Sequence, residues 1–200
     1  MSNPIDFYFD FSSPYGYFGA VEIGKLAAKF GRTVNWHPIL LGPIFKQIGT
    51  NSLVTIPVKG DYSRLDMKRT ARFHDIFFKE PSNFPIGAQV AARAVLWTQE
   101  QHPEKAEDLI RTLYSAYFTE DIDISVAATV LRIAGDVGLD ATALEAALGT
   151  QEIKDKLRAA TEDAAKKGVF GSPFVIVDGE PFWGFDRFTQ LEAFLNNGKI

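Results

Sequence analysis

The sequence predicts an α/β protein in which both ends of the chain form one sheet, with a large helical block inserted between them. Three observations lead to this prediction. The chain opens on a strand–helix–strand pattern, the stretch from about 43 to 167 carries mostly helical periodicity, and the C-terminal part returns to strands followed by a helix. Neither end supplies enough strands for a stable sheet of its own, so both ends are expected in the same sheet.

The N-terminal elements follow from local patterning. Residues 5–11 alternate with a period of two and place four apolar side chains on one face, which predicts a buried or half-buried strand. The polar turn at 12–14 breaks this strand. Residues 15–30 then carry apolar side chains at helical spacing until Gly31, and 33–36 predict a second strand. A helix of this size suits a right-handed crossover between two parallel strands.

The middle of the chain predicts helices joined by polar loops. Ser125 and Asp140 are candidate N-caps, and Gly138 and Gly149 stand at candidate helix ends. Stretches containing Gly, Asn and Pro predict loops at 45–58 and 80–85. The predicted helices cover residues 61–78, 86–101, 104–118, 125–136, 140–148 and 151–167.

The C-terminal part predicts a β-hairpin and a closing helix. Residues 174–177 form a continuous apolar run, which is typical of a buried strand. Asp178-Gly179 is a hairpin turn signal, and 181–183 predict the partner strand. Residues 186–195 predict the last helix.

The length and the order of elements predict two units in one compact chain. The chain has 200 residues, enough for one domain with an inserted subdomain. The expected units are a sheet-bearing unit of residues 1–42 and 168–200 and a helical unit of residues 43–167.

Composition and charge exclude several classes of protein. The net charge is −4 and the pI is near 5.4, which argues against nucleic-acid binding because no excess positive charge is available to neutralise phosphates. No apolar run in the sequence reaches the ~18–20 residues that a membrane span needs. The first six residues lack the basic start and apolar stretch of a signal peptide, which favours a cytoplasmic location.

The sequence contains no cysteine. Disulfides, thiolate-bound zinc, iron–sulfur clusters and a cysteine nucleophile are therefore excluded, and any thiol chemistry must use a thiol from outside the chain. The three histidines, His37, His74 and His102, are widely spaced. Such isolated histidines are more often surface or structural residues than ligands, so no metal site is predicted.

Ser13 is the first candidate functional residue. It lies between the first predicted strand and the first predicted helix, where unpaired backbone N–H groups and a partial positive charge favour an anion or a thiolate. Its hydroxyl can donate a hydrogen bond to such a group. The alternative is an ordinary N-cap serine followed by a first-turn proline.

Three further positions have both a functional and a purely structural interpretation. Ser172-Pro173 precedes a buried strand, and the proline is either cis or an ordinary trans residue at the strand entry. Asp186 either caps the last helix or accepts hydrogen bonds from a ligand ammonium group. Lys59 lies in a predicted loop, where a lysine is usually only solvated and gains a role opposite a ligand carboxylate.

Several segments together resemble a known family. The segment FYFDFSSPYGY at 7–17 is similar to the first strand and turn of kappa-class glutathione transferases and, within them, most similar to the bacterial 2-hydroxychromene-2-carboxylate isomerases. Further matches lie in the same order at 38–45, 59–62, 169–173 and 183–187. The resemblance implies a thioredoxin-like fold with a large helical insertion of the DsbA type.

The resemblance also implies a glutathione site. Ser13 matches the serine that hydrogen-bonds the glutathione sulfur, with the neighbouring Ser12 as the weaker alternative. Ser172 matches the residue whose backbone pairs with the cysteinyl part of glutathione, and the following proline is implied to be cis. Phe185, through its backbone, and Asp186, through its carboxylate, match the positions that hold the γ-glutamyl group.

The remaining implied contacts lie between the second strand and the first inserted helix. Lys59 matches a lysine near the glycyl or another carboxylate of glutathione. The family's Gly-Asn step is altered here, because threonine follows Gly49 directly. Either Thr50 or Asn51 therefore takes the role of the asparagine.

The activity that the resemblance implies is a cis–trans isomerisation of small aromatic carboxylates. It interconverts 2-hydroxychromene-2-carboxylate and trans-o-hydroxybenzylidenepyruvate in aromatic catabolism, with glutathione returned unchanged. A homodimer is implied as well. Two alternatives stay open: a kappa-class transferase or peroxidase that consumes glutathione, and a non-catalytic thioredoxin-like binding module in which Ser13 is only a cap. A disulfide oxidoreductase is excluded, since the helix start lacks Cys-x-x-Cys.

Overall fold

The computed structural model describes residues 3–200; Met1 and Ser2, which the sequence assigns to the sheet-bearing unit, lie outside the described residues. The elements are β1 Ile5–Phe9, α1 Pro14–Lys29, β2 Val34–Pro38, α2 Leu41–Ile48, η1 Leu53–Thr55, α3 Lys59–Phe73, α4 Gln89–Gln101, η2 Pro103–Lys105, α5 Ala106–Phe118, α6 Ala127–Asp136, α7 Ala141–Gly149, α8 Gln151–Lys166, β3 Phe174–Val177, β4 Glu180–Trp183, η3 Phe185–Arg187 and α9 Phe188–Asn197.

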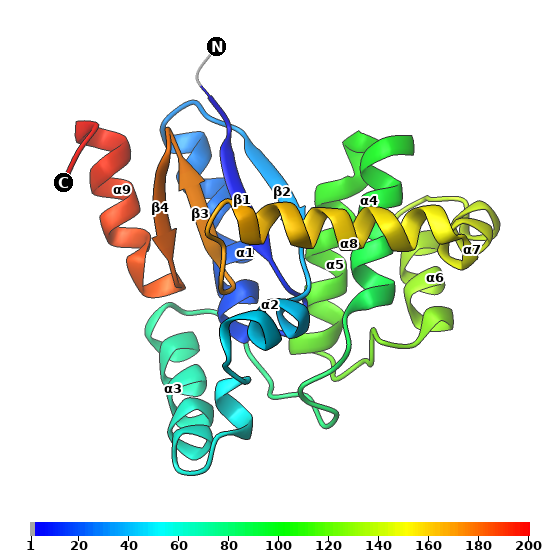
Figure 1. The fold of residues 1–200 in the computed structure, drawn as a ribbon, viewed down its shortest axis with the longest axis horizontal. Coiled ribbons are helices and arrows are strands. Elements are labelled where there is room, and N and C mark those ends of the chain that lie inside the picture. The colour runs from blue at the N-terminus through cyan, green and yellow to red at the C-terminus, as the bar shows by residue number, and fades with distance from the viewer. Residues whose placement is uncertain (1–2) are drawn as a thin grey trace.

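Both ends of the chain meet in one four-stranded sheet, as the sequence predicts. The strand order is β2-β1-β3-β4 (Figure 1). The crossover through α1 makes β1 and β2 parallel, whereas β1–β3 and β3–β4 are antiparallel. Asp178 and Gly179 both have positive φ, 51° and 86°, which is the conformation of a two-residue hairpin turn. The predicted α/β fold and the hairpin are confirmed.

The two faces of the sheet bury alternate side chains of β1. Phe7 and Phe9 face a large core that also contains residues of α1, α4 and α5. Tyr8 faces the other way, into a smaller cluster with Phe174 and residues of α2 and α8. Figure 1 shows α8 crossing the front of the sheet while α1 lies behind it. Because both faces are covered, β1 is buried along most of its length.

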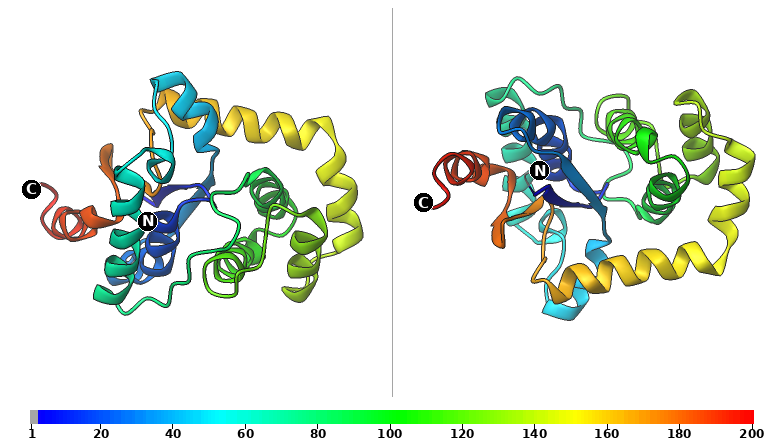
Figure 2. Two further views of the ribbon diagram at one scale, coloured as in Figure 1. Left: turned by 90° about the horizontal axis from the view of Figure 1, so that it is seen from below. Right: turned by 90° about the horizontal axis from the view of Figure 1, so that it is seen from above.

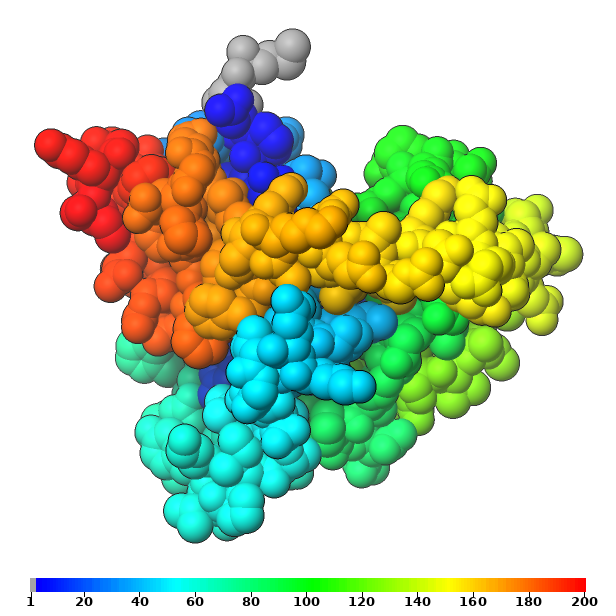
Figure 3. Space-filling view, viewed as in Figure 1, coloured from blue at the N-terminus to red at the C-terminus, as the bar shows by residue number. Residues whose placement is uncertain are grey.

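The inserted helices form a group beside the sheet. Helices α4 to α7 lie together, and α8 returns from them to the sheet (Figure 2). In the space-filling view the α2 segment, in cyan, packs directly beneath the end of α8 (Figure 3). The large core is continuous from the sheet into the insertion, because Tyr114 of α5 packs against the ring of Phe9 at 5.8 Å between ring centroids.

Helix α2 is the main element that the sequence prediction missed. Residues 45–58 were expected to form a loop, but α2 extends to Ile48 before Gly49 ends it with a left-handed φ of 72°. Asp10 explains the error, since its carboxylate accepts a hydrogen bond from the Leu41 N–H at 2.7 Å. The residue that stabilises the start of α2 is thus far away in sequence, and no local capping residue signals it.

Other boundaries also differ from the predictions. Helix α3 ends at Phe73 rather than at 78, because Asp75 adopts a positive φ of 53° and the chain turns. Ser125 is not an N-cap: its N–H and hydroxyl both bond the Asp123 carboxylate, at 2.8 and 2.6 Å, and α6 begins later with Val126 as N-cap. Asp140 does cap its helix, accepting from two backbone N–H groups.

None of the helices within residues 3–200 is both long and apolar enough to cross a membrane.

Candidate functional site

The candidate site is built where β1 ends and α1 begins. The strand stops at Phe9 rather than at Phe11, and the chain turns so that the Ser13 N–H bonds the Asp10 carbonyl at 2.9 Å. Ser13 is the N-cap of α1 and Pro14 is its first residue, with no acidic side chain in the first turn. No carboxylate of the first turn of α1 itself therefore offsets the partial positive charge of the helix N-terminus.

The Ser13 hydroxyl has two partners. It accepts a hydrogen bond from the Gly16 N–H at 3.0 Å and donates one to the Ser172 carbonyl at 2.8 Å. The capping role is therefore real, and it does not exclude the functional one. The same hydroxyl points at the loop that holds the second implied site residue, although the two serines lie 159 positions apart in the sequence.

The Ser172 segment faces the start of α1. The Ser172–Pro173 peptide is cis, as the resemblance implies, and a second cis bond at Phe84–Pro85 lies outside the site motifs. The Ser172 hydroxyl accepts from the Asp10 N–H at 3.0 Å. The Ser172 backbone N–H has no hydrogen-bond acceptor within residues 3–200. An open backbone donor beside an extended loop fits a peptide-like ligand.

Gly16 allows these groups to approach one another. A Cβ placed on Gly16 would lie 2.6 Å from the Ser172 Oγ, 2.8 Å from the Tyr114 Oη and 3.2 Å from the Ser13 Cβ. Polar side chains from the α1 cap, from α5 and from the Ser172 loop thus converge on Gly16, one of the three glycines of α1. A glycine is required here by the close approach rather than by its backbone angles.

Asp10 and Tyr114 complete the polar cluster, and the sequence motifs did not single out either of them. The buried Asp10 carboxylate accepts from the Ser12 N–H and hydroxyl, both at 2.8 Å, and from Leu41 N–H at 2.7 Å. Burial raises the pKa of Asp10, and these hydrogen bonds oppose the rise. The Tyr114 phenol donates to the Asp10 carbonyl at 3.0 Å, and its burial raises its pKa well above 10.

The sequence carries a signal for Asp10 but none for Tyr114. An aspartate followed by Ser12 at a strand end is the pattern of a turn in which the carboxylate bonds the backbone two residues on, as it does here. Tyr114 lies on a helix of mixed apolar residues, and only the packing of α5 against α1 and β1 brings it to the cluster.

Phe185 and Asp186 are tied to the Ser172 loop through the backbone. The Gly184 N–H donates to the Pro173 carbonyl at 3.0 Å, so the turn that follows β4 lies against this loop. Phe185 is buried, whereas Asp186 is exposed and pairs with Arg187 at 3.0 Å. Asp186 caps no helix, which removes the structural alternative for this residue, and its carboxylate is exposed at the surface, where a ligand ammonium group would compete with Arg187 for it.

Thr50, Asn51 and Lys59 lie on the segment from α2 to α3, and all three are exposed. Lys59 is the first residue of α3 rather than part of a loop. Within residues 3–200, no hydrogen bond or ion pair joins any of the three to Ser13 or Ser172. The structure therefore brings Ser13, Ser172 and the Phe185–Asp186 turn together, but it does not bring these three residues into contact with them.

Helix α3 is nevertheless anchored to the start of α1. The Tyr15 phenol donates to the Asp66 carboxylate at 2.6 Å, and burial together with this carboxylate raises the pKa of Tyr15. Tyr17, two residues further along α1, is buried and donates to the Phe77 carbonyl at 2.9 Å. Both tyrosines thus fix the α3 segment against α1, and Tyr17 belongs to the core.

The histidines lie apart from one another. The His37 ring bonds the Asp6 carboxylate at 2.7 Å, and burial lowers the pKa of His37 against the opposing effect of Asp6. The His74 ring packs against Phe185 at 4.7 Å, and His102 follows α4. Residues 3–200 contain no group of three or more side chains that could hold a metal ion.

Comparisons with known proteins identify the family to which the chain is similar. The model of the DSBA-like thioredoxin domain matches residues 4–196. A 2-hydroxychromene-2-carboxylate isomerase of Sphingobium xenophagum is 31% identical over 199 residues, covering 98% of this chain and 99% of that protein. Glutathione S-transferase kappa 1 of Rattus norvegicus is 27% identical, covering 96% of this chain and 89% of the relative.

Solved structures give the same picture. A 2-hydroxychromene-2-carboxylate isomerase structure superposes with a TM-score of 0.87 at 26% identity, covering 96% of this chain and 94% of that one. A probable DsbA oxidoreductase of Streptomyces coelicolor has a TM-score of 0.78 at 18% identity, covering 100% and 92%, and shares the fold. The chain belongs to the DsbA-like thioredoxin family, together with the 2-hydroxychromene-2-carboxylate isomerases and the kappa-class glutathione transferases.

Proposed function

We propose that this protein is a glutathione-dependent isomerase that interconverts 2-hydroxychromene-2-carboxylate and trans-o-hydroxybenzylidenepyruvate. One observation carries the proposal: in a chain without cysteine, the Ser13 hydroxyl stands at the N-terminus of α1 opposite the carbonyl of Ser172. The 31% identity over nearly the whole chain to an isomerase of this name supports the choice of reaction.

The residues present fit the sulfur and the peptide backbone of glutathione. A helix N-terminus whose first turn carries no acidic side chain favours a thiolate, and a hydroxyl at its cap is a donor for the sulfur. The open N–H and the carbonyl of Ser172 fit the cysteinyl backbone. Rotation of the Ser13 hydroxyl from the Ser172 carbonyl to the sulfur would release that carbonyl for the ligand N–H.

The other expected contacts extend along the same edge of the molecule. The Phe185 backbone and the Asp186 carboxylate hold the γ-glutamyl group, whose ammonium is the natural partner of an exposed carboxylate. Lys59 holds a carboxylate of glutathione, with Thr50 or Asn51 beside it. The anchoring of α3 to Tyr15 supports this arrangement, since it holds the segment that carries Lys59 near the start of α1.

When bound, glutathione supplies a thiolate that adds reversibly to the conjugated double bond of the ring-opened substrate, permits rotation about the resulting single bond and leaves unchanged. The protein's task is to keep the sulfur ionised and positioned. Ser13 donates to the sulfur, the helix N-terminus lowers the free energy of its negative charge, and the Ser172 backbone fixes its direction. No proton has to be exchanged with a side chain of the site for the double bond to isomerise.

A kappa-class transferase is the second candidate. Kappa 1 and kappa 2 glutathione transferases are 26–27% identical over most of this chain, and the thiol site as argued serves both activities. In a transferase the thiolate would stay bonded to the electrophile, so glutathione would be consumed.

An assay with and without glutathione tests these alternatives. The change in absorbance of 2-hydroxychromene-2-carboxylate is followed while free thiol is titrated, and 1-chloro-2,4-dinitrobenzene serves as a control electrophile. We expect interconversion that requires glutathione and leaves the thiol concentration constant. If the protein consumes thiol with the control electrophile and does not convert 2-hydroxychromene-2-carboxylate, it is a transferase and not the isomerase. If neither assay shows activity and calorimetry shows no glutathione binding, the protein is a non-catalytic binding module.

The homodimer and the aromatic-catabolic setting that the resemblance implies stay predictions, as does the cytoplasmic location that the N-terminal residues favour. Sedimentation equilibrium of the purified chain checks the first of them, and a single species at the mass of two 22.2 kDa chains is the expected result.

A further inference from the structure

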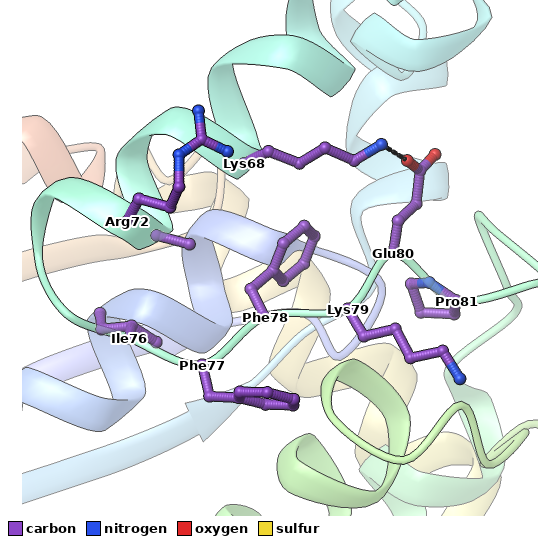
Figure 4. Close-up of a pocket in the computed structure, with 9 residues that line it drawn as sticks. Lys68, Arg72, Ile76, Phe77, Phe78, Lys79, Glu80 and Pro81 are labelled. Carbon is purple, nitrogen blue, oxygen red and sulfur yellow. Dashed lines mark ion pairs between the residues drawn. The ribbon is translucent and has the colours of Figure 1, made fainter.

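A cavity lies beside α3, and none of Asp10, Ser13, Tyr114 and Ser172 lines it. It has a volume of about 670 Å³ and opens between the second half of α3 and the segment 76–81 (Figure 4). The cavity is lined by apolar and by charged residues. The apolar ones are Ala71, Ile76, Phe77, Phe78 and Pro81, and the charged ones are Lys68, Arg72, Lys79 and Glu80. We call it the α3 groove. Its volume is within the ~300–1,000 Å³ of small-molecule sites.

The apolar part of the groove is held in place. Phe78 packs its ring against Phe18 of α1 at 5.4 Å and against Phe118 of α5 at 5.8 Å. The carbonyl of the neighbouring Phe77 accepts a hydrogen bond from the Tyr17 phenol, yet the Phe77 side chain is 71% exposed. A fixed backbone thus presents a large aromatic ring to solvent beside the groove, which favours an apolar ligand at this position.

The charges around the groove leave one cation unpaired. Glu80 already pairs with Arg64 and, at 2.9 Å, with Lys68, and Lys79 lies 3.3 Å from Asp121. Within residues 3–200 no acidic side chain pairs with Arg72. Figure 4 shows Arg72 beside Lys68 on the α3 rim, with Phe78 below them. The groove therefore carries excess positive charge in a chain whose net charge is −4.

We propose that the α3 groove binds a small aromatic carboxylate. The Arg72 guanidinium is free to donate two parallel hydrogen bonds to a carboxylate, a geometry that a lysine lacks. Phe77 and the apolar floor pack against the aromatic ring of the ligand. Lys79 adds a second cation on the opposite rim.

The proposal does not depend on the thiol chemistry. None of the residues that line the groove belongs to the cluster of Asp10, Ser13, Tyr114 and Ser172. Binding in the groove is therefore expected with or without glutathione, and failure of the isomerase assay would leave it unaffected.

Fluorescence titration with 2-naphthoate tests the proposal, with 2-naphthamide as the uncharged probe of the same shape. We expect saturable binding of one naphthoate per chain, unchanged by saturating glutathione, and binding of the amide weaker by roughly tenfold or more, since a charge-assisted bond is lost. Arg72→Gln is expected to weaken naphthoate binding to the same extent. Its matched control is Arg132→Gln, an exposed arginine of α6 outside the groove, which is expected to bind as the unmodified protein does.

A second pair of variants tests the aromatic wall. Phe77→Ser should weaken binding of both probes, whereas Phe73→Ser removes a ring that is even more exposed but lies outside the groove, and should weaken neither. Circular dichroism verifies that all four variants fold. The proposal is overturned by absence of saturable binding, by equal effects of the Arg72 and Arg132 changes, by equal affinity for acid and amide, or by displacement of naphthoate by glutathione.

Discussion

At the scale of single residues, Ser13 combines a structural and a chemical role in one hydroxyl. It accepts a hydrogen bond from the Gly16 N–H and donates one to the Ser172 carbonyl. A cap residue and a sulfur donor need the same position, because both interact with the N-terminal end of a helix. The two roles can be separated only by a control that removes a cap elsewhere.

Ser13→Ala is expected to reduce glutathione-dependent turnover by roughly ten- to a hundredfold, the effect of one lost hydrogen bond to a charged group. Its pH–rate profile should move to higher pH, because the sulfur loses a donor that favours its ionised form. Stability should fall by about 1 kcal/mol through the lost cap. Asp140→Ala, which removes the cap of α7, should show the same loss of stability with unchanged turnover and pH profile. An unshifted profile for Ser13→Ala would remove Ser13 from the chemistry.

Gly16→Ala is expected to destabilise the protein by about 1–3 kcal/mol, the usual effect of overpacking. Its added methyl group would meet the Ser172 Oγ at 2.6 Å and the Tyr114 Oη at 2.8 Å, so turnover should fall as well. Gly135→Ala in α6 is the matched control, because no atom lies within 4 Å of its Cβ position. It should stabilise the helix by up to about 1 kcal/mol. The midpoint temperature of thermal unfolding should therefore fall for Gly16→Ala and rise for Gly135→Ala.

At the scale of elements, carboxylates join segments that are distant in sequence. Asp10, which follows β1, accepts a hydrogen bond from the first N–H of α2. Asp66 of α3 accepts one from the Tyr15 phenol. At the other end of the sheet, Asp178 in the β3–β4 turn pairs with Arg32, which precedes β2. The Arg32 guanidinium also donates to the Asn3 carbonyl at 3.0 Å. Hydrogen bonds to carboxylates, and in the case of Asp178 an ion pair, thus fix chain segments at both ends of the sheet.

The Arg32–Asp178 pair predicts a small dependence of stability on acid pH. Hydrogen bonds from Arg32 hold the pKa of Asp178 below its ordinary 3.8, so the stabilisation is present above that value and is lost as pH falls through the lowered pKa. Arg32→Gln should reduce the free energy of unfolding at pH 7 by less than about 1 kcal/mol, since the pair is partly exposed. The difference from the unmodified protein in urea titrations should shrink below that pH. A difference that is constant down to pH 2 would contradict the assignment.

At the scale of the whole molecule, the sheet and the helical insertion share their largest core. Phe9 of β1 and Trp36 of β2 lie in the same cluster as Leu109 and Tyr114 of α5. The division into residues 1–42 with 168–200 and 43–167 is therefore a proposal about topology, and we do not expect the two units to unfold separately.

A single cooperative transition is expected in chemical denaturation. Trp36 reports on the sheet and Trp97 on helix α4, so single-tryptophan variants retaining one or the other should unfold at the same denaturant concentration, coincident with circular dichroism. An isolated fragment of residues 43–167 should be unfolded, because it lacks the sheet residues of the shared core. Two separated midpoints, or a folded fragment, would show independent domains.

Much of this architecture could be predicted from local sequence. The alternation at residues 5–9 and the turn at Asp178-Gly179 are properties of short segments, and the structure confirms them. Where predictions were wrong, a residue outside the local pattern determined the structure. Asp10 accepts a hydrogen bond from the first N–H of α2, and Asp123 accepts one from the Ser125 hydroxyl, which therefore does not cap α6. Propensity and periodicity report only on neighbours along the chain.

The sequence by itself determined the α/β order of elements, the family resemblance and, through the missing cysteines, that any reacting thiol comes from outside. Only the tertiary structure decided that Ser13 faces the Ser172 carbonyl and that the buried Asp10 and Tyr114 support them. The physical reason is distance along the chain. Contacts between residues more than a hundred positions apart arise from the packing of whole helices and strands, and no local pattern encodes which side chains then meet.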